Sequence, residues 1–307
     1  MDHKHTKYTP ESKKNHLLVH LGALFAVSVW GTSFVSTKVL LDNGLHAVEI
    51  YIYRFLLAYI IMLCCCHKKM FANTLRDEFL LAICGICGGS IYFIAENTAL
   101  NYTLTSNVSL ITTLAPLLTT LLIGVLYRNE RPGLWVYIGS LIALAGVACI
   151  IFKSGFNLKV MPLGDFLALA AAFSWAIYAV VLRKINATYS ATFITRKTFF
   201  YGLLTALPFL AFEPQICPPS VLLEPVVMGN IVFLGIVASL LCYLIWAQTI
   251  KRLGAIKASN YLYVQPVVTM IFSAIVFEND PITFVGCIGC ILIIGGVWFG
   301  DRMTRQN

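Results

Sequence analysis

The residues best suited to chemistry in this sequence are a carboxylate, a guanidinium and several tryptophans inside long apolar segments. Glu96 lies about five residues from the end of one segment, and Arg54 is about the eighth residue of another. A charge inside hydrocarbon costs at least about 2.5 kcal/mol unless it is paired or hydrated. At about 1.5 Å per residue, both groups would lie on the order of 10 Å below the same surface. We expect that they can pair, as a structural ion pair or as a coupling site; the alternative is that the Glu96 carboxylate reaches the outer surface.

Aromatic side chains form a second set, at corresponding places in the two halves of the chain. Trp30 and Trp175 fall near the middle of their apolar segments, with Ser33 on the same face as Trp30 and Tyr178 one turn after Trp175. Tryptophans usually gather at membrane interfaces, so a pair at mid-depth is typical of a binding cavity. Core packing is the alternative.

A third set lies on one face of the segment that contains Glu96. Gly85, Gly89, Tyr92 and Glu96 recur at steps of four, three and four residues, and the equivalent series in the second half ends at Trp246. The glycines predict close helix packing. We expect Tyr92, Glu96 and Trp246 to line a cavity.

Two prolines interrupt corresponding segments about halfway along. Pro116 and Pro266 each lack an N–H, so a break or kink is predicted at both places, and such breaks are typical of gating helices. Polar side chains surround them. The candidates for holding a polar solute there are Ser109, Thr112, Ser259 and Tyr263. The alternative is that these hydroxyls only satisfy their own helices.

The composition places these residues in a membrane protein. Of 307 residues, 59% are hydrophobic and 12% charged, far more apolar than a soluble domain of this length. The net charge of +8 comes from Lys and Arg in short clusters between apolar runs, which reports topology and excludes a nucleic-acid face. The lipid bilayer and a small-molecule solute are the predicted partners.

The apolar runs predict ten transmembrane helices. They lie at approximately 18–37, 47–66, 79–101, 104–126, 133–152, 164–182, 198–213, 229–250, 257–277 and 282–300. With the N-terminus in the cytoplasm, eighteen of the 22 Lys and Arg residues fall in cytoplasmic segments and three in outer ones. Both termini are therefore expected in the cytoplasm.

The chain is also duplicated. Residues 85–147 align without a gap on 235–297, pairing Ser109 with Ser259 and Pro116 with Pro266. Because five spans are an odd number, the second half must cross in the opposite sense, so we predict an all-α membrane protein of two inverted five-helix repeats. The expected boundaries are a tail at 1–16, repeats at 17–153 and 163–300, and a tail at 301–307.

The order of these motifs resembles the EamA-type members of the drug/metabolite transporter superfamily. The resemblance covers nearly the whole chain. It is carried by Trp30-Gly31 with Lys38, Arg54-Phe55, Ala99-Leu100-Asn101-Tyr102, Ser109 to Pro116 to Glu130, and Trp175, Tyr178, Arg183-Lys184, Ser259, Pro266 and Glu278. It implies ten helices, a central cavity, alternating access, export from a bacterial inner membrane and no cofactor. A homodimer is one option for its assembly.

Catalytic and metal motifs are missing from the sequence, so an enzyme is not expected. The pairs Cys84/Cys87 and Cys287/Cys290 have zinc-like spacing, but each lies inside a lipid-length helix and is expected to pack without metal. We predict a secondary transporter of small neutral or zwitterionic metabolites such as amino acids, with proton coupling as an option. The alternatives are a nucleotide-sugar or sugar-phosphate exchanger of the same fold, and a non-transporting membrane receptor or scaffold.

Overall fold

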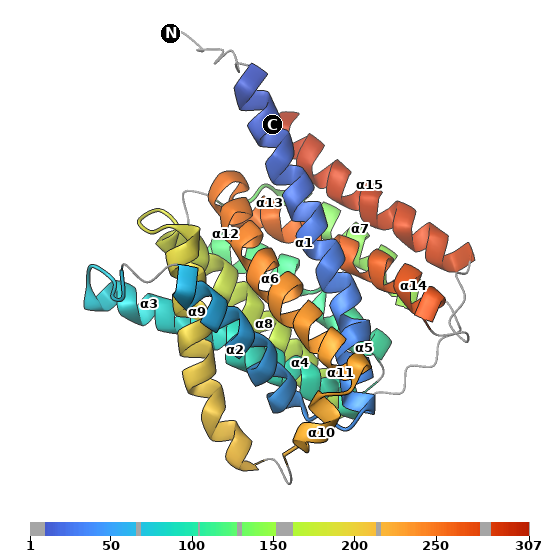
Figure 1. Ribbon diagram of the computed structural model, residues 1–307. Helices are drawn as coiled ribbons and strands as arrows, with labels where there is room; N and C mark the ends of the chain where they lie inside the picture. Colours follow the sequence, from blue (N-terminus) through green and yellow to red (C-terminus); the bar gives the residue numbers. More distant parts are fainter. Residues whose placement is uncertain are drawn as a thin grey trace.

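The computed structural model describes residues 10–65, 69–103, 105–127, 131–151, 162–212, 216–276 and 284–306, and every regular element within these ranges is helical. The helices form a bundle in which segments from both halves of the chain interleave (Figure 1). Leucine, isoleucine, valine and alanine dominate the helices, so their formation follows from the apolar runs and the need to satisfy backbone groups internally.

The first half contains α1 to α7. Their bounds are α1 Pro10–Asp42, α2 Ala47–Cys65, α3 Leu75–Gly85, a π-helical segment Ile86–Ser90, α4 Ile91–Tyr102, α5 Thr105–Thr112, α6 Ala115–Leu126 and α7 Leu134–Ile151. The hydroxyl of Thr74 caps α3 by accepting from the Asp77 N–H at 3.1 Å. Helix α4 continues α3 through the π segment, so these elements together form one long apolar stretch.

The second half contains α8 to α15. Their bounds are α8 Pro162–Ile185, α9 Ala191–Ala206, a 3-10 segment Leu207–Phe212, α10 Pro219–Leu222, α11 Pro225–Val232, a π-helical segment Phe233–Leu241, α12 Cys242–Leu253, α13 Ala255–Asn260, a 3-10 segment Tyr261–Val264, α14 Gln265–Val276 and α15 Phe284–Gln306. Ser190 caps α9 through the Phe193 N–H at 3.3 Å.

The start of α9 differs from the sequence expectation. The helix begins at Ala191, whereas the apolar run predicted a span from 198. The reason is that Arg196 and Lys197 are buried and bonded instead of lying in a solvated connection: Arg196 donates to the Lys69 carbonyl, and Lys197 pairs with Glu78. Helix α9 can therefore begin before its apolar run, because its buried polar residues have bonding partners.

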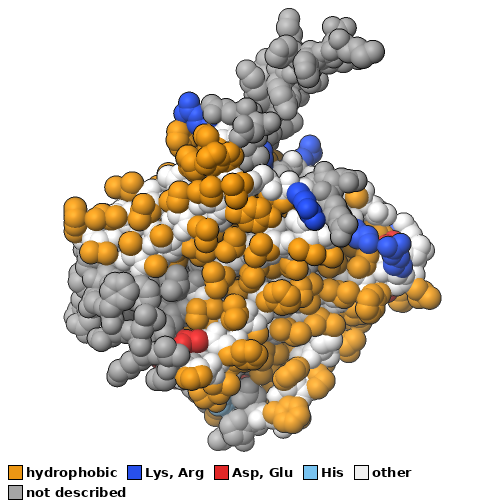
Figure 2. All heavy atoms as spheres, turned by 180° about the vertical axis from the view of Figure 1, so that it is seen from behind, with side chains coloured by type: hydrophobic (Ala, Val, Ile, Leu, Met, Phe, Trp, Pro, Cys, Tyr) orange, Lys and Arg blue, Asp and Glu red, His pale blue; other side chains and the backbone are white. Residues whose placement is uncertain are grey.

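The outer surface is suited to lipid. Large apolar side chains such as Leu121, Val125, Phe166, Ile275 and Ile291 are exposed. Figure 2 shows hydrophobic side chains over most of the described part of one face, with Lys and Arg near its upper edge. Among the described residues, five stretches are long and apolar enough to cross a bilayer, namely Leu17–Asp42, Ala47–Cys65, Leu75–Tyr102, Pro162–Ile185 and Pro225–Leu253. Shorter apolar helices are Ala115–Leu126, Leu134–Cys149 and Phe284–Gly300.

The last helices of the two halves pack directly on each other. A Cβ on Gly139 would lie 2.8 Å from Cα of Gly300, and one on Gly146 would lie 2.7 Å from the backbone nitrogen of Ile293. Because no side chain larger than hydrogen fits at either place, α7 and α15 approach backbone to backbone. This pair stands at one side of the bundle, beside α14 (Figure 1).

Candidate functional site

A central cavity lies between helices of both halves. Trp30 and Ser33 of α1, Tyr92 and Glu96 of α4, and Thr112 of α5 line it from the first half. The second half contributes Trp175 of α8, Leu262 and Gln265. Its volume is about 20 Å³, enough for about one water molecule. The cavity is therefore narrow in this conformation, and any larger solute requires the helices to separate.

Aromatic rings form a large part of the wall. The ring centroids of Trp30 and Trp175 are 5.3 Å apart and nearly perpendicular, and Trp246 packs 5.1 Å from Trp30. On the other side of Trp175 lie Tyr92 at 4.9 Å and Tyr178 at 5.0 Å. The two contacts of Trp30 are edge-to-face and the two with the tyrosines are tilted, and together they fix the rings relative to one another. Residues more than 140 positions apart in the sequence therefore form one rigid aromatic cluster.

Two π-helical segments position this cluster. They occupy equivalent places in the two halves, at Ile86–Ser90 and Phe233–Leu241. Backbone carbonyls in both accept bonds from other helices: Trp30 Nε1 donates to Ala238 at 2.8 Å, and the Ser174 hydroxyl donates to Cys87 at 2.7 Å. Wide turns of this kind are frequent at functional sites because they leave carbonyls available.

Glu96 is the only carboxylate among the described residues that line the central cavity. It is buried, at 7% exposure, and accepts a bond from the Tyr92 hydroxyl at 3.3 Å. The aromatic wall excludes most water from this group. A buried carboxylate in such a wall is suited to binding a proton or a cationic group of a solute.

Arg54 lies near this carboxylate but forms no ion pair with it. Its Nε donates to the Ser239 hydroxyl at 2.9 Å, and its guanidinium carbon is 4.7 Å from the centroid of the Phe93 ring. The expected direct contact between Arg54 and Glu96 is therefore absent in this conformation. Phe93, which also lines the cavity, lies under the guanidinium, and Arg54 influences Glu96 only electrostatically.

The other predicted site residues lie around the cavity or away from it. Trp246 and Tyr178 support the aromatic cluster from outside the lining. The Ser109 carbonyl accepts from the Thr113 hydroxyl, and the Ser259 hydroxyl is buried without a partner in the described part of the chain. Tyr263 lines a different, larger cavity near the ends of α6 and α8. Phe34 and Ala115 line the central cavity but were not predicted as site residues.

Known proteins resemble this chain along almost its whole length. The EamA-like transporter family matches residues 17–152 and 162–299, once in each half. The chain belongs to the EamA-like transporter family. An "Uncharacterized transporter" of Archaeoglobus fulgidus is 27% identical over 96% of this chain and 100% of that protein. A "Probable amino-acid metabolite efflux pump" of Salmonella typhimurium is 26% identical, over 92% of this chain and 95% of its own.

Two further comparisons agree with this family. A "Probable terminal-alkyne amino-acid exporter" of Streptantibioticus cattleyicolor is 26% identical over 75% of each chain. A solved structure, titled "Crystal structure of protein", has a TM-score of 0.73 at 20% identity, covering 95% of this chain and 98% of its own, which shows a shared fold. The family and these names point to a multi-pass membrane transporter, not to an enzyme.

The EamA-like chain has helix breaks at both predicted prolines. Helix α5 ends at Thr112 and α6 restarts at Ala115, so Pro116 lies in the first turn of α6. In the other half, a 3-10 segment ends at Val264 and Pro266 is the second residue of α14. Proline suits the first turn of a helix because its missing N–H has no partner there. Both breaks are adjacent to residues of the central cavity.

Polar contacts at two ends of the EamA-like bundle were not predicted from the sequence. Near one end, Lys197 of α9 donates to the Met70 carbonyl at 3.3 Å and pairs with Glu78, which also accepts from the Ala72 N–H at 2.7 Å. In the connection before α10, the Cys217 N–H donates to Glu49 of α2 at 2.7 Å. Each repeat therefore holds a connecting segment of the other. The sequence did contain one signal for these contacts: charged residues stand near the starts of helices, next to polar connecting segments.

The cysteines show no sign of metal binding in the part of the chain that is described. Cys84 and Cys87 are free thiols, as are Cys287 and Cys290, and no group of three or more His, Cys, Asp or Glu is close enough there to hold an ion.

Proposed function

We propose that this chain is a secondary transporter that exports small neutral or zwitterionic metabolites, such as amino acids, by alternating access. The observation that carries the proposal is the central cavity, where both halves contribute aromatic walls and one half contributes a buried carboxylate. The printed names of the relatives from Salmonella typhimurium and Streptantibioticus cattleyicolor support the solute class.

The polar groups around the cavity suit the two ends of an amino acid. Glu96 offers a negative charge for an ammonium group, and the faces of Tyr92 and Trp175 add cation–π attraction. The indole N–H of Trp175, which lines the cavity, is buried and has no partner in the described part of the chain. An unpaired buried donor costs about 1 to 3 kcal/mol, so a solute carboxylate that accepts from it would be favoured.

The alternatives receive less support from the same cavity. Among the described lining residues there is no Lys or Arg, whereas a nucleotide sugar or sugar phosphate needs cations for its phosphate groups. A receptor or scaffold has no requirement for equivalent helix breaks on both sides of a central cavity. The proposed topology has ten spans in an inner membrane, with both termini in the cytoplasm.

We further propose that Glu96 binds the coupling proton. Its carboxylate lines the cavity, accepts from Tyr92 and interacts electrostatically with Arg54, so proton binding there changes the charge that the solute and the guanidinium meet. A solute that binds only one charge state of Glu96 couples its own movement to that of a proton.

The solute class is tested first by thermal unfolding of purified protein with amino acids, nucleosides, quaternary amines and sugar phosphates. A ligand raises stability by RT ln(1 + [L]/Kd), so an amino acid at 100 times its Kd should add about 2.7 kcal/mol. Stabilisation by sugar phosphates alone would contradict the proposed class.

Glu96→Gln then tests the coupling role. The variant keeps the shape and removes the charge, so we expect uptake of the stabilising amino acid into proteoliposomes to lose its dependence on a pH gradient. Solute-for-solute exchange should continue at a lower apparent affinity, because the proposed ammonium site has lost its charge. Glu224→Gln, which changes an exposed carboxylate before α11, is the matched control and should keep that dependence. Gradient-driven uptake that survives Glu96→Gln would remove Glu96 from the coupling mechanism.

A further inference from the structure

The hydroxyl groups of Ser33 and Thr112, which line the central cavity, already have hydrogen-bond partners. The Ser33 hydroxyl donates to the Trp30 carbonyl at 2.8 Å, and the Thr112 hydroxyl donates to the Val108 carbonyl at 2.8 Å. In each case donor and acceptor lie on one helix, so these bonds persist when the helices separate to admit a solute. Neither hydroxyl proton is therefore available to a solute.

The ring donors of the cavity differ in the same respect. The Trp30 indole N–H donates to the Ala238 carbonyl at 2.8 Å, and the Tyr92 hydroxyl donates to Glu96 at 3.3 Å. The indole N–H of Trp175 is buried and has no partner within the described ranges. Buried donors normally find a partner, so this N–H is a place where a solute acceptor gains free energy on binding.

Gln265 is a second lining residue whose side chain has unused donors. It is partly buried and is the first residue of α14, at the second helix break. Its backbone carbonyl accepts from the Thr269 hydroxyl at 3.0 Å, whereas its side-chain amide has no hydrogen bond in the part of the chain that the structure describes. A glutamine amide carries two N–H donors and no charge.

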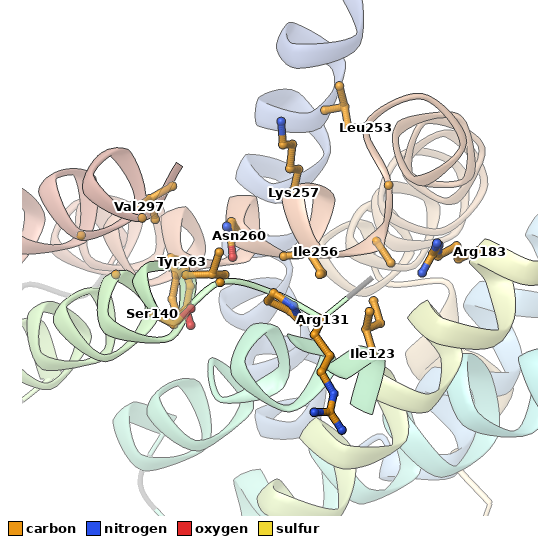
Figure 3. A pocket seen from close by; sticks show the side chains of 18 residues that line it. Ile123, Arg131, Ser140, Arg183, Leu253, Ile256, Lys257, Asn260, Tyr263 and Val297 are labelled. Carbon is orange, nitrogen blue, oxygen red and sulfur yellow. The ribbon is translucent and has the colours of Figure 1, made fainter. Parts of the chain in front are cut away.

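The residues before Gln265 show which way this part of the chain faces. Asn260 and Tyr263 line a separate cavity of about 380 Å³ (Figure 3), whereas Leu262 and Gln265 line the central one. The 3-10 segment Tyr261–Val264 thus lies between the two cavities, with residues directed to both. Gln265 follows on the side of the central cavity.

The unused donors and the carboxylate come from different halves of the chain. Glu96 belongs to α4 of the first half, whereas Trp175 belongs to α8 and Gln265 to α14 of the second half. The apolar lining residues are Phe34, Phe93, Ala115 and Leu262. A solute with an ammonium group, a carboxylate and an apolar side chain would satisfy the groups of both halves and bridge them.

We propose that Gln265 is the residue that makes the site specific for solutes with a carboxylate. This proposal rests on the proposed function. The Gln265 amide and the Trp175 N–H bind the solute carboxylate, and Glu96 binds its ammonium group. Bonds to an ionised acceptor are stronger than bonds between neutral groups. An amine without a carboxylate leaves both donors unpaired, and a site built to bond a group rejects an analogue that lacks it.

The test compares two amino acids with the amines that lack only their carboxylates. Apparent affinities come from thermal unfolding of the purified full-length protein with L-leucine or 3-methylbutylamine, and with L-phenylalanine or 2-phenylethylamine. We expect the unmodified protein to bind at least one amino acid about tenfold more tightly than its amine. Gln265→Leu should weaken binding of that amino acid about tenfold and leave its amine within about twofold, because only the amino acid loses a bond.

Two further variants and a control separate this role from a structural one. Glu96→Gln should weaken the amino acid and the amine together, because both carry the ammonium group. Gln265→Glu keeps the shape and adds a charge that repels a carboxylate, so it should reverse the preference in favour of the amine. Gln248→Leu changes an exposed glutamine of α12 outside both cavities and should bind as the unmodified protein does.

The possible outcomes distinguish this proposal from the proposed function. Equal affinity for amino acids and amines would overturn it alone, and so would an amino-acid preference that survives Gln265→Leu. The same holds if Gln265→Leu weakens the amino acid and its amine by the same factor, which is the sign of a structural role. If Gln265→Leu does not fold, the comparison with Gln265→Glu decides. Stabilisation by none of the four compounds would also overturn the proposal, and the wider panel of solutes would then decide on the proposed function.

Discussion

Arg54 shows how much a single buried charge depends on its surroundings. It is 1% exposed, with its Nε bonded to Ser239, and its second terminal nitrogen has no partner in the described part of the chain. An arginine so deep in an apolar core is costly unless something compensates its charge. The Phe93 ring and the nearby Glu96 carboxylate provide that compensation in this conformation.

A double-mutant cycle measures this compensation. Arg54→Leu should destabilise the protein more when Glu96 is present than in the Glu96→Gln background, because the leucine leaves a buried carboxylate without its nearby cation. We expect a coupling free energy of roughly 0.5 to 3 kcal/mol from unfolding in mixed detergent micelles. The same cycle with Glu224→Gln should be additive. Additive effects for Arg54 and Glu96 would show that the two charges do not interact.

At the residue scale, the sequence identified the types of residue at the candidate site better than the contacts between their side chains. The structure places Trp30, Ser33, Glu96, Thr112 and Trp175 around one cavity. The sequence could not show whether Arg54 contacts Glu96. Two residues at similar depth on different helices meet only if both helices are rotated toward each other, and depth does not determine that rotation. Their use in binding or coupling stays a prediction.

At the scale of helices, both proline breaks were predicted and neither π segment was. The spacing of Gly85, Gly89, Tyr92 and Glu96 was interpreted as that of a regular α-helix. In the structure, Ile86–Ser90 and the equivalent segment Phe233–Leu241 instead form wider, π-helical turns. A close helix contact lies beside the first of them: a Cβ on Gly85 would lie 2.7 Å from the backbone nitrogen of Gly202, so α9 approaches α3 closely there. When two segments far apart in the sequence approach this closely, the only sign of it in the sequence is a glycine at the point of contact.

The proline breaks give a prediction for the transport cycle. Pro116→Ala and Pro266→Ala permit a continuous helix through each break, so they should bias the equilibrium between inward- and outward-open states. A bias on the order of 1 kcal/mol changes that ratio about fivefold, and we expect folded variants with several-fold slower uptake into proteoliposomes.

Pro225→Ala is the matched control for these variants. Pro225 begins α11 at an exposed position outside the central cavity, so its replacement should leave uptake unchanged. Uptake at the unmodified rate in both Pro116→Ala and Pro266→Ala would show that the breaks do not take part in the cycle.

At the scale of the whole molecule, the contacts between α7 and α15 support the proposed inversion. The sequence repeat makes Gly139 equivalent to Gly289 and Gly146 equivalent to Gly296. In the structure Gly139 faces Gly296 and Gly146 faces Gly289, so exchanging the two halves exchanges one contact with the other. Two equivalent helices that cross in this antiparallel way are related by a two-fold axis. If that axis lies in the membrane plane, the halves have opposite orientations.

The orientation of the chain in the membrane follows from charge and is tested by labelling. Short cytoplasmic connections collect Lys and Arg, which predicts that the connection between α8 and α9 lies inside and the one containing α10 lies outside. Thr188 and Ser220 are exposed in these two places, so each position is suited to a single cysteine in a chain without its ten native ones. A membrane-impermeant maleimide should label Ser220→Cys in intact cells and Thr188→Cys only after permeabilisation. The reverse pattern would place both termini outside. Labelling of both positions in intact cells would mean that an even number of spans separates Thr188 from Ser220, which would contradict the proposed repeat.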